Sequence, residues 1–490
     1  MPAAPSVSQS HDRPLKLLRI EGLRLCLRFL EMLDQSHLFR CRKAFHPDSL
    51  NKGSYHLSHG FRRITLRESF VNRVAVIGSG ISGLAAAYYL SRKHEVYLFE
   101  RESRLGGHTH TVTVDSSRGP LAVDTGFIVH NDRTYPHLIK LLAELGIARV
   151  HSDMSFAVSC AKTGYEYSSR GLRGFFAQTK NVISPRPYRL YSEILRFNRQ
   201  APGIFSRPDA DRLKLGDFLD ENSYTPEFRE FYLVPMAAAV WSCAPNAVNE
   251  FPAAMLVRFF QNHNFLTTTQ QHQWKTITGG CSTYIAPITA PLKERIFTST
   301  VIRSIRRENG GVTIRFADGR PEMNFDHVIF AINGDRVLPL IENPTDTERD
   351  VLSHFATSAN DVVLHTDEAL LPRREAARAS WNYLLHLDSR NGHSPVTMTY
   401  HMNRLQSLPV EENYCVTLNA NNQIRKDRIL RSFVYHHPIF TLDSMWAQKR
   451  WAEISGVNRI HFAGAYWQYG FHEDGVNSAL RVAHALGVQV

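Results

Sequence analysis

The sequence has few cysteines and no long hydrophobic run, and each shortage excludes a class of protein. Its 490 residues include six cysteines without a C-x-x-C pair, which excludes a disulfide framework and a zinc ribbon. So little cysteine is typical of a reducing compartment, and we expect a cytoplasmic protein. The longest apolar stretch, Phe231 to Trp241, contains Pro235 and is too short to span a membrane. The sequence also has no G-x-S-x-G elbow, so no motif indicates hydrolysis.

The net positive charge is small outside the N-terminal segment. The formal net charge is +11, and residues 1–73 supply +7 of it, with 13 Lys and Arg against six Asp and Glu. The rest of the chain therefore carries only +4. Because nucleic-acid recognition needs a basic face on a folded domain, we expect no nucleic-acid partner.

The N-terminal segment, residues 1–71, has two interpretations. Leu15 to Leu33 mixes apolar and basic side chains, which fits a basic amphipathic helix in a transit segment or at a membrane surface. The same stretch contains Glu21, an acidic residue of the kind that transit peptides avoid. The simpler interpretation is an extension outside the folded protein, which begins near Val71. Peripheral membrane contact through this segment is the alternative.

Glycines are spaced for a nucleotide-binding turn directly after this start. Arg73 to Ile77 reads as a short buried strand, and Gly78-Ser79-Gly80-Ile81-Ser82-Gly83 follows at once. Leu84 to Arg92 reads as a helix, and Glu95 to Phe99 reads as a second strand that ends at Glu100. This order of strand, G-x-G-x-x-G, helix, strand and acid predicts a dinucleotide-binding unit.

Each glycine of the motif has a physical role. Gly78 makes the tight turn, Gly80 lets the backbone approach a pyrophosphate, and Gly83 lets the helix pack on the sheet. The helix N-terminus offers free N–H groups and a positive dipole to the phosphates. Glu100 is placed to accept hydrogen bonds from the adenosine ribose.

The residues after Glu100 distinguish FAD from NAD. Arg104-Leu105-Gly106-Gly107 resembles the E-x-x-x-R-x-G-G extension of the FAD-dependent amine oxidase superfamily, and Asp124-Thr125-Gly126-Phe127 resembles its D-x-G segment. In that family the paired glycines let the chain cross the flavin side of the cofactor. Thr278-Gly279-Gly280-Cys281-Ser282 fits the family's middle segment, and we expect a helix from Thr283.

The C-terminus resembles the family's closing F-A-G…G-x-x-E-G-A motif. Arg459 to Gly464 reads as a strand entering a tight turn, Gly470 to Gly475 as a second turn, and Val476 to Leu486 as an amphipathic helix. A helix N-terminus aimed at the isoalloxazine stabilises negative charge on the reduced flavin. No cysteine lies near this motif, so the resemblance implies noncovalent FAD.

The resemblance covers residues 71–490 and implies an α/β fold. We expect a Rossmann-like FAD-binding domain from residues 72–125, 275–340 and 455–490, intertwined with a substrate domain of helices and a mixed sheet from 126–274 and 341–454. In the family, the residue at the position of Val301 contacts the adenine through its backbone. The residues assigned to the cofactor are Gly78, Ser79, Gly80, Ile81, Ser82, Gly83, Glu100, Arg101, Arg104, Gly106, Gly107, His108, Thr109, Val301, Gly464, Ala465, Glu473, Asp474, Gly475 and Val476.

Further local patterns give expectations about elements. We expect strands at Thr298–Arg303, Val312–Phe316 and Asp326–Ala331, and a turn at His436-His437-Pro438. In the substrate domain we expect a helix at Thr134–Leu145 and strands at Val396–Met402 and Tyr414–Asn419 that roof the flavin.

Within this superfamily, the sequence resembles NAD/FAD-binding proteins whose genes often neighbour cyclopropane-fatty-acid synthases, at Gly106 to Thr109, Ser380 to Tyr383, Met402 to Gln406 and Gly464 to Trp467. It implies oxidation or desaturation of a small or lipid-like substrate by hydride transfer to flavin N5. An amine oxidase that releases peroxide, a flavin isomerase without net redox, and a non-catalytic flavin protein are the alternatives. The lysine that many amine oxidases keep near N5 is not assigned, because position alone does not identify Lys275 with it.

No acid/base pair is visible in the sequence, so we assign no catalytic residue. We also assign no oligomeric state. Tyr466 and Trp467 lie between the C-terminal glycine turns and line either the substrate pocket or the core. Trp381 suits a pocket wall or a packed strand, and Arg404 suits an anion site or a structural ion pair. His108 and His110 lack a third ligand, so we expect no metal.

Overall fold

The computed structural model describes residues 71–267, 271–386 and 396–490. Residues 1–70 therefore lie outside the described residues, and so do the basic segment and the membrane contact that we expect within residues 1–71. The chain divides into two units, and apart from α5 and the first two residues of α6 (Pro185–Gln200) the features below belong to the one that holds 71–178 and 187–490. The described part of the other, residues 179–186, contains α5 (Thr179–Ile183). Within the described ranges, no helix has the length and apolarity to cross a bilayer.

A parallel five-stranded sheet carries the glycine motif. Its strands come from three separate stretches of sequence, as the alternation of strands and helices in a Rossmann-like fold requires. In spatial order they are β10 (Ile296–Phe297), β2 (Glu95–Phe99), β1 (Arg73–Ile77), β14 (His327–Phe330) and β20 (Ile460–Phe462). The V-A-V-I run of β1 is fully apolar because this central strand is buried on both faces.

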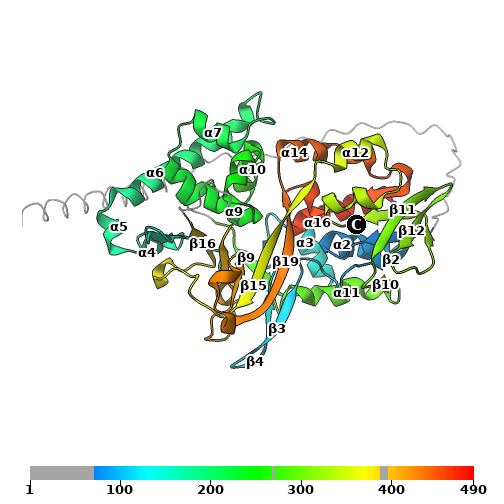
Figure 1. The fold of residues 1–490 in the computed structure, drawn as a ribbon, viewed down its shortest axis with the longest axis horizontal. Coiled ribbons are helices and arrows are strands. Elements are labelled where there is room, and N and C mark those ends of the chain that lie inside the picture. Colours follow the sequence, from blue (N-terminus) through cyan, green and yellow to red (C-terminus); the bar gives the residue numbers. More distant parts are fainter. Residues whose placement is uncertain (1–70, 268–270, 387–395) are drawn as a thin grey trace, which may run out of the picture. The chain divides into compact units, whose positions relative to one another are not determined.

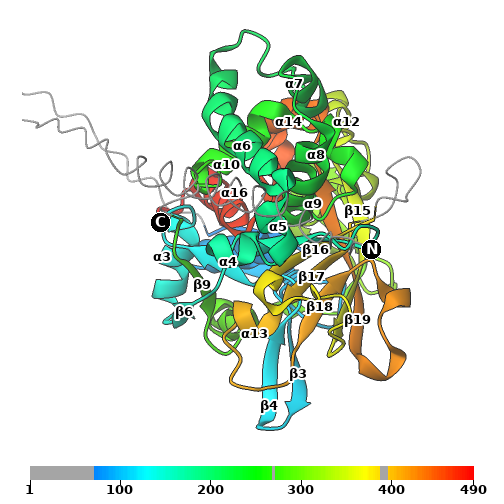
Figure 2. The ribbon, with the colours of Figure 1, turned by 90° about the vertical axis from the view of Figure 1, so that its left-hand side faces the viewer.

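Two long helices pack beside this sheet and against each other, α2 (Ile81–Leu90) and α16 (His472–Ala485) (Figure 1). An antiparallel sheet of β11 (Ile302–Glu308), β12 (Gly311–Phe316) and β13 (Met323–Phe325) lies next to it. The hairpin of β3 (Thr111–Ser116) and β4 (Gly119–Asp124) projects from the body of this unit (Figure 2).

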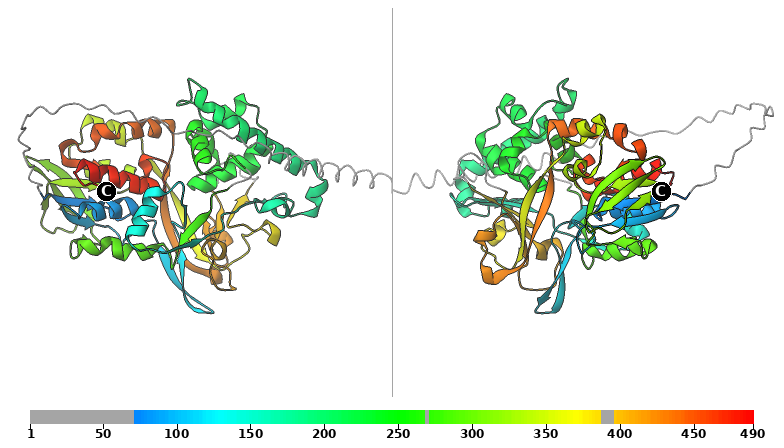
Figure 3. Two further views of the ribbon diagram at one scale, coloured as in Figure 1. Left: turned by 180° about the vertical axis from the view of Figure 1, so that it is seen from behind. Right: turned by 45° about the vertical axis from the view of Figure 1, so that its right-hand side comes forward.

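A mixed seven-stranded sheet forms the second layer. In spatial order its strands are β19 (Ile429–Ile439), β15 (Ala356–His365), β18 (Cys415–Leu418), β17 (Met398–His401), β16 (Trp381–Leu385), β7 (Phe156–Cys160) and β8 (Glu166–Ser168). The strands β15 and β19 pair along almost their whole length. They run between the helices α9 (Val234–Trp241) and α10 (Ala253–Asn262) and the part that holds α2 and α16 (Figures 1 and 3).

Apart from the 16-residue helix α6, the remaining elements are short. A third small sheet joins β5 (Val129–Asn131), β9 (Trp274–Ile277) and β6 (Arg149–His151). The other α-helices are α3 (Pro136–Glu144), α4 (Gly171–Phe175), α6 (Pro185–Gln200), α7 (Leu215–Glu221), α8 (Pro226–Phe228), α11 (Ile285–Thr289), α12 (Asp346–Leu352), α13 (Met402–Leu405), α14 (Leu442–Lys449) and α15 (Trp451–Ile454).

Two expected elements are wrong. The strand expected at Thr298–Arg303 begins only at Ile302, because Ser299 has a left-handed φ of 50° that interrupts the extended chain. The turn expected at His436-His437-Pro438 is part of β19. Proline is tolerated there because β19 is the edge strand of its sheet, so no outer ladder bond is lost.

Candidate cofactor site

The first glycine loop is tightly packed at two positions and open at the third. A Cβ on Gly83 would lie 1.9 Å from the carbonyl oxygen of Gly78, and Gly78 itself has a left-handed φ of 97°. Around Gly80, in contrast, no heavy atom of the described residues other than its two chain neighbours lies within 4 Å of the place that a Cβ would take. Gly80 is also the N-cap of α2 and provides no side-chain cap, so the first N–H groups of the helix are free to bind an anion.

Glu100 lies beside this loop, as the spacing predicts. One carboxylate oxygen accepts hydrogen bonds from Ser79 N at 2.8 Å and Ser79 Oγ at 2.6 Å, and the other accepts from Glu102 N at 2.9 Å. The segment that leads to Val301 lies alongside, because Thr300 N donates to Glu100 O at 2.8 Å. Val301 is 46% exposed. Glu100 and Val301 thus stand together, where the resemblance puts an adenosine.

The second glycine turn crosses the first. Gly106 N donates to Ser79 O at 3.0 Å, and a Cβ on Gly107 would come within 3.1 Å of Gly80 Cα. This approach requires glycine at 107, where φ is also positive. Arg101 and Arg104 flank the turn. Arg101 pairs with Glu102. Burial of the His108 ring lowers its pKa to about 4, and the guanidinium of Arg104 is the second cause of this shift.

The N-terminus of α16 meets the N-terminus of α2. A Cβ on Gly475 would lie 2.6 Å from Ile81 Cγ2 and 2.9 Å from Ser82 Oγ, so the two helices touch at this glycine. Gly464 N donates to Ser478 Oγ at 3.0 Å, which ties the F-A-G turn to the same helix. Segments almost 400 residues apart in sequence therefore converge, as binding of one extended cofactor requires. The neighbouring Ala465 and Val476 are part of the same convergence.

The remaining family motifs reach the same place through a buried cluster. Thr109 Oγ1 shares hydrogen bonds with the hydroxyl of Tyr284 and with His472 Nε2, the latter at 3.1 Å. The ring of Phe127 stacks on His472 with centroids 3.6 Å apart. Thr109 follows the second glycine turn, Phe127 ends the D-x-G segment, and Tyr284 follows Cys281. The cluster therefore joins four motifs that are separate in sequence.

Glu473 turns away from the glycine loops and binds a neighbouring helix. Its carboxylate accepts hydrogen bonds from His137 Nδ1 at 2.8 Å, His137 N at 3.1 Å and Leu138 N at 2.9 Å. These backbone groups belong to the first turn of α3, which would otherwise lack acceptors. In these contacts Glu473 positions α16 against α3, and direct contact with the cofactor stays a prediction.

Replacing Glu473 with Ala should lower the free energy of unfolding by about 2–3 kcal/mol, since two backbone donors and one imidazole lose their acceptor. Glu144→Ala is the matched control, because Glu144 lies on α3 and makes only a surface pair with Arg92. Denaturant titrations of both variants measure the difference. Equal losses in the two variants would show that Glu473 does not cap α3.

Asp474 is buried at the first turn of α16 and accepts a hydrogen bond from Phe471 N at 2.8 Å. Burial, with a smaller contribution from Glu473, raises its pKa from an ordinary 3.8 to about 7. A raised pKa in the folded state means that this group stabilises the fold at low pH. That contribution is lost as the pH rises through about 7.

The unfolding free energy of cofactor-free protein should therefore fall by about 2–4 kcal/mol between about pH 4 and pH 8, relative to the Asp474→Asn variant. Asparagine keeps an acceptor for Phe471 N and does not ionise. Urea titrations of both proteins across this range measure the effect. A constant difference between them at every pH would contradict the burial of a titrating carboxyl here.

Three of the four pocket candidates are aromatic and occupy two different surroundings. Tyr466 and Trp467 are buried in a hydrophobic cluster, and their rings pack on Phe355 with centroids 4.7 and 4.8 Å away. Trp381 starts β16, its ring meets Tyr400 edge to face at 5.1 Å, and its indole N–H has no hydrogen-bond partner among the described residues. Pocket roles for these three residues stay predictions.

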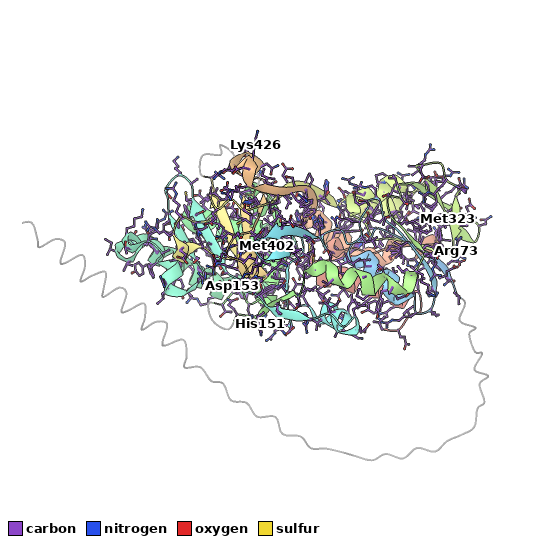
Figure 4. All side chains as sticks on the ribbon, turned by 90° about the horizontal axis from the view of Figure 1, so that it is seen from below. Arg73, His151, Asp153, Met323, Met402 and Lys426 are labelled. Carbon is purple, nitrogen blue, oxygen red and sulfur yellow. The ribbon has the colours of Figure 1, made fainter. Side chains whose placement is uncertain are left out.

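Arg404 lies in α13, and Figure 4 labels the first residue of this helix, Met402, together with Asp153. The nearest approach between Arg404 Nη1 and Asp153 Oδ2 is 3.9 Å, which makes a weak ion pair. Ser152 Oγ donates to Leu405 O at 2.7 Å and holds the two segments together. The pair fits the structural interpretation of Arg404, although its Nε is buried without a hydrogen-bond partner among the described residues.

The sequence did not reveal the hydrogen-bond partners of several buried polar residues, including Asp124 of the D-x-G segment. Asp124 accepts hydrogen bonds from three other segments, and Asn360 binds His437 across two strands. Such contacts leave no signal in sequence, because the partners lie far apart along the chain. The missed partner of Lys275 is Asp132, which also pairs with Arg149 at 2.8 Å. This pairing places the Lys275 ammonium in a partly exposed ion-pair group.

The geometry fits a flavin dinucleotide on two independent observations. Open space over Gly80, beside uncapped helix N–H groups, suits a pyrophosphate. His108 Nε2, beside the second glycine turn, and both ring nitrogens of His130, whose ring lies 6.3 Å from that of Phe127, are buried without a hydrogen-bond partner among the described residues. Buried polar atoms of this kind need a partner that the polypeptide does not supply. Among the described residues, no group of His, Cys, Asp or Glu is arranged to hold a metal.

The model of the flavin-containing amine oxidoreductase family matches residues 81–486, which is most of the chain. The protein belongs to this family. One curated relative is "Putative flavin-containing monoamine oxidase AofH" of Mycobacterium tuberculosis, which is 29% identical over 292 residues. That match covers 57% of this chain and 61% of the relative, so the chain spans less than two thirds of the curated protein that it resembles.

Several solved structures share the fold. Putrescine oxidase bound to putrescine superposes with a TM-score of 0.62 at 16% identity, covering 86% of this chain and all of the other. A fatty acid isomerase from P. acnes that produces CLA gives a TM-score of 0.59 at 17% identity, covering 85% and 99%. Cyclohexylamine oxidase from Brevibacterium oxydans gives 0.59 at 16% identity, covering 85% and 98%. These likenesses confirm the predicted α/β architecture of a flavoprotein of this family.

Proposed function

We propose that this chain binds FAD noncovalently and oxidises or desaturates a lipid-like substrate. Glu100 beside the first glycine loop supports an adenosine-containing cofactor, since a carboxylate at this position suits the ribose hydroxyls. Noncovalent binding is supported by the sequence, in which Cys415 is the last cysteine and precedes the whole C-terminal motif. The cofactor-binding residues and the three-stretch FAD domain are part of this proposal.

The apolar character of α9 and its surroundings supports the lipid-like substrate, and this observation carries the proposal. Met236 and Val240 lie one turn apart on α9, and both keep partly exposed apolar surface. The preceding Tyr232 is also partly exposed, although burial raises the pKa of its hydroxyl to about 12. The helix contacts β16, where Trp381 packs against Tyr400. An acyl chain fits such surfaces better than a charged amine does.

The residues of the chain have a limited set of tasks in this reaction. When bound, the flavin supplies the hydride acceptor at N5, while the substrate loses a hydride and a proton and gains a double bond. The two helix N-termini at Gly80 and His472 hold the phosphates and favour negative charge at the ring. Aromatic and aliphatic side chains orient the substrate and exclude water.

Anaerobic titration of the FAD-loaded protein tests the proposal. Long-chain fatty acids or acyl lipids should bleach the flavin absorbance, and air should restore it. Short-chain acids of the same head group serve as the control, because they lack the apolar surface that α9 binds. Failure of every acyl lipid to bleach the flavin would overturn the lipid-like substrate.

A true amine oxidase is the second candidate, because the curated relatives carry that name. It predicts bleaching by putrescine or aromatic amines and release of peroxide in air. The ion pair of Lys275 with Asp132 argues against Lys275 as the N5 lysine of such enzymes. An isomerase without net redox would turn over acyl lipids only after the flavin is reduced, so the same titration separates all three.

A further inference from the structure

A chain of three polar side chains crosses the seven-stranded sheet and begins at Asn419. The amide oxygen of Asn419 accepts a hydrogen bond from Asp361 N at 3.0 Å, and its amide nitrogen donates to Val396 O at 3.0 Å. Both partners are backbone groups with only one possible role, so they fix which end of the amide is oxygen. Asn419 also has a left-handed φ of 57°, which asparagine tolerates better than most residues.

The orientation of Asn419 determines that of Asn360. Asn419 Nδ2 donates to Asn360 Oδ1 at 2.8 Å, which leaves the amide nitrogen of Asn360 to face His437 Nδ1 at 3.0 Å. An amide nitrogen can only donate, so His437 Nδ1 must accept. Neutral His437 therefore carries its proton on Nε2. Asn360 is 3% exposed, so water does not compete for these bonds.

His437 stands beside the second glycine turn. Its ring lies 5.2 Å from the ring of His108, which follows Gly106 and Gly107. Burial first, then His108 and His436, lower the pKa of His437 to about 3, so the ring is neutral at physiological pH. Part of the His437 side chain nevertheless keeps accessible surface. Its Nε2 has no hydrogen-bond partner among the described residues.

We propose that His437 is a hydrogen-bond donor to the ring end of the bound flavin, fixed as the Nε2–H tautomer by Asn360 and Asn419. This inference rests on the proposed binding of FAD. The donor end is preorganised because backbone groups orient the side-chain amide of Asn419, and Asn419 in turn orients that of Asn360. A neutral N–H of this kind binds a carbonyl or ring nitrogen without adding a charge to the site.

The isosteric variant Asn360→Asp reverses the direction of the hydrogen bond between residue 360 and His437. A carboxylate can only accept, so it would draw the His437 proton to Nδ1 and leave Nε2 as an acceptor. We expect histidine-detected NMR of isotope-labelled protein to show the Nε2–H tautomer for His437 in wild type and the Nδ1–H form in the variant. We expect the FAD dissociation constant of Asn360→Asp to rise about tenfold, the factor that one lost hydrogen bond gives.

Two further variants test whether the effect passes through His437. His437→Phe should weaken FAD binding about tenfold, and Asn360→Asp added to it should weaken binding no further. His437→Gln, which retains an N–H donor, should recover part of the affinity. Asn343→Asp is the control for the added charge, because Asn343 is exposed and outside the chain of amides.

The outcomes separate this inference from the proposal on which it rests. The Nδ1–H tautomer in wild-type protein without FAD would overturn the inference directly. Unchanged FAD affinity in His437→Phe would overturn it as well. Wild-type protein that takes up no FAD would instead refute the proposed function, and the tautomer measurement does not depend on that result.

Discussion

The Gly80→Val variant should fold as the wild type does and should lose at least about a hundredfold in affinity for FAD. Beyond its two chain neighbours, no heavy atom of the described residues lies within 4 Å of the place that a Cβ would take, and φ at this residue is −63°, which valine adopts without strain. The added side chain would instead occupy the space in front of the uncapped N–H groups of α2. A pyrophosphate needs that space in order to reach the backbone.

Gly83→Ala is the matched variant. It should destabilise the fold itself, whereas Gly80→Val should weaken FAD binding and leave the fold intact. Its Cβ would lie 1.9 Å from the carbonyl oxygen of Gly78, a backbone atom that cannot move without opening the loop. We expect a loss of about 3 kcal/mol or more in the unfolding free energy of the cofactor-free protein. Thermal unfolding and flavin fluorescence titrations measure both properties for both variants. FAD affinity of Gly80→Val equal to that of wild type would place the pyrophosphate elsewhere.

The second large effect concerns Asp124, which joins three segments around the glycine turns. Its carboxylate accepts hydrogen bonds from Cys281 N at 2.9 Å, Thr111 Oγ1 at 2.6 Å and Gln406 Nε2 at 3.0 Å. The side chain is fully buried. Asp124→Ala leaves one buried and two partly buried donors without this acceptor, so we expect a loss of about 3–5 kcal/mol in unfolding free energy.

Asp115→Ala is the control for Asp124, because Asp115 is exposed on the same β3–β4 hairpin. It should change the unfolding free energy by less than about 0.5 kcal/mol. Asp124→Asn retains one acceptor oxygen and should lie between the two. Denaturant titrations of the three variants give the order. An Asp124→Ala variant as stable as Asp115→Ala would show that the carboxylate does not hold these segments together.

The sequence predicted best what depends on neighbouring residues. The strands β1 and β2 have the expected boundaries because their apolar runs are short and end at glycine or at Glu100. The helix α16 begins four residues before the expected Val476, since the cap is made by Asp474, whose hydrogen bond to Phe471 N no periodicity reveals. Hydrophobic periodicity marks the interior of a helix better than its end.

Contacts between distant segments were beyond reach of the sequence. Glu473 was assigned to the cofactor by its motif, but its bonds to the first turn of α3 depend on a helix more than 300 residues earlier. The turn expected at His437 is a strand because β15 pairs with it, and that partner is identifiable only in the fold. Asn360 shows no motif at all, although its amide orients His437.

The absorbance spectrum of the purified full chain, from about 300 to 550 nm, tests the central claim most directly. We predict the two-band spectrum of an oxidised flavin, released in full into the supernatant when the protein is denatured, with FAD as the released compound. A colourless protein that also fails to take up added FAD would contradict the account. The meeting of the two helix N-termini at Gly475 would then serve the fold alone.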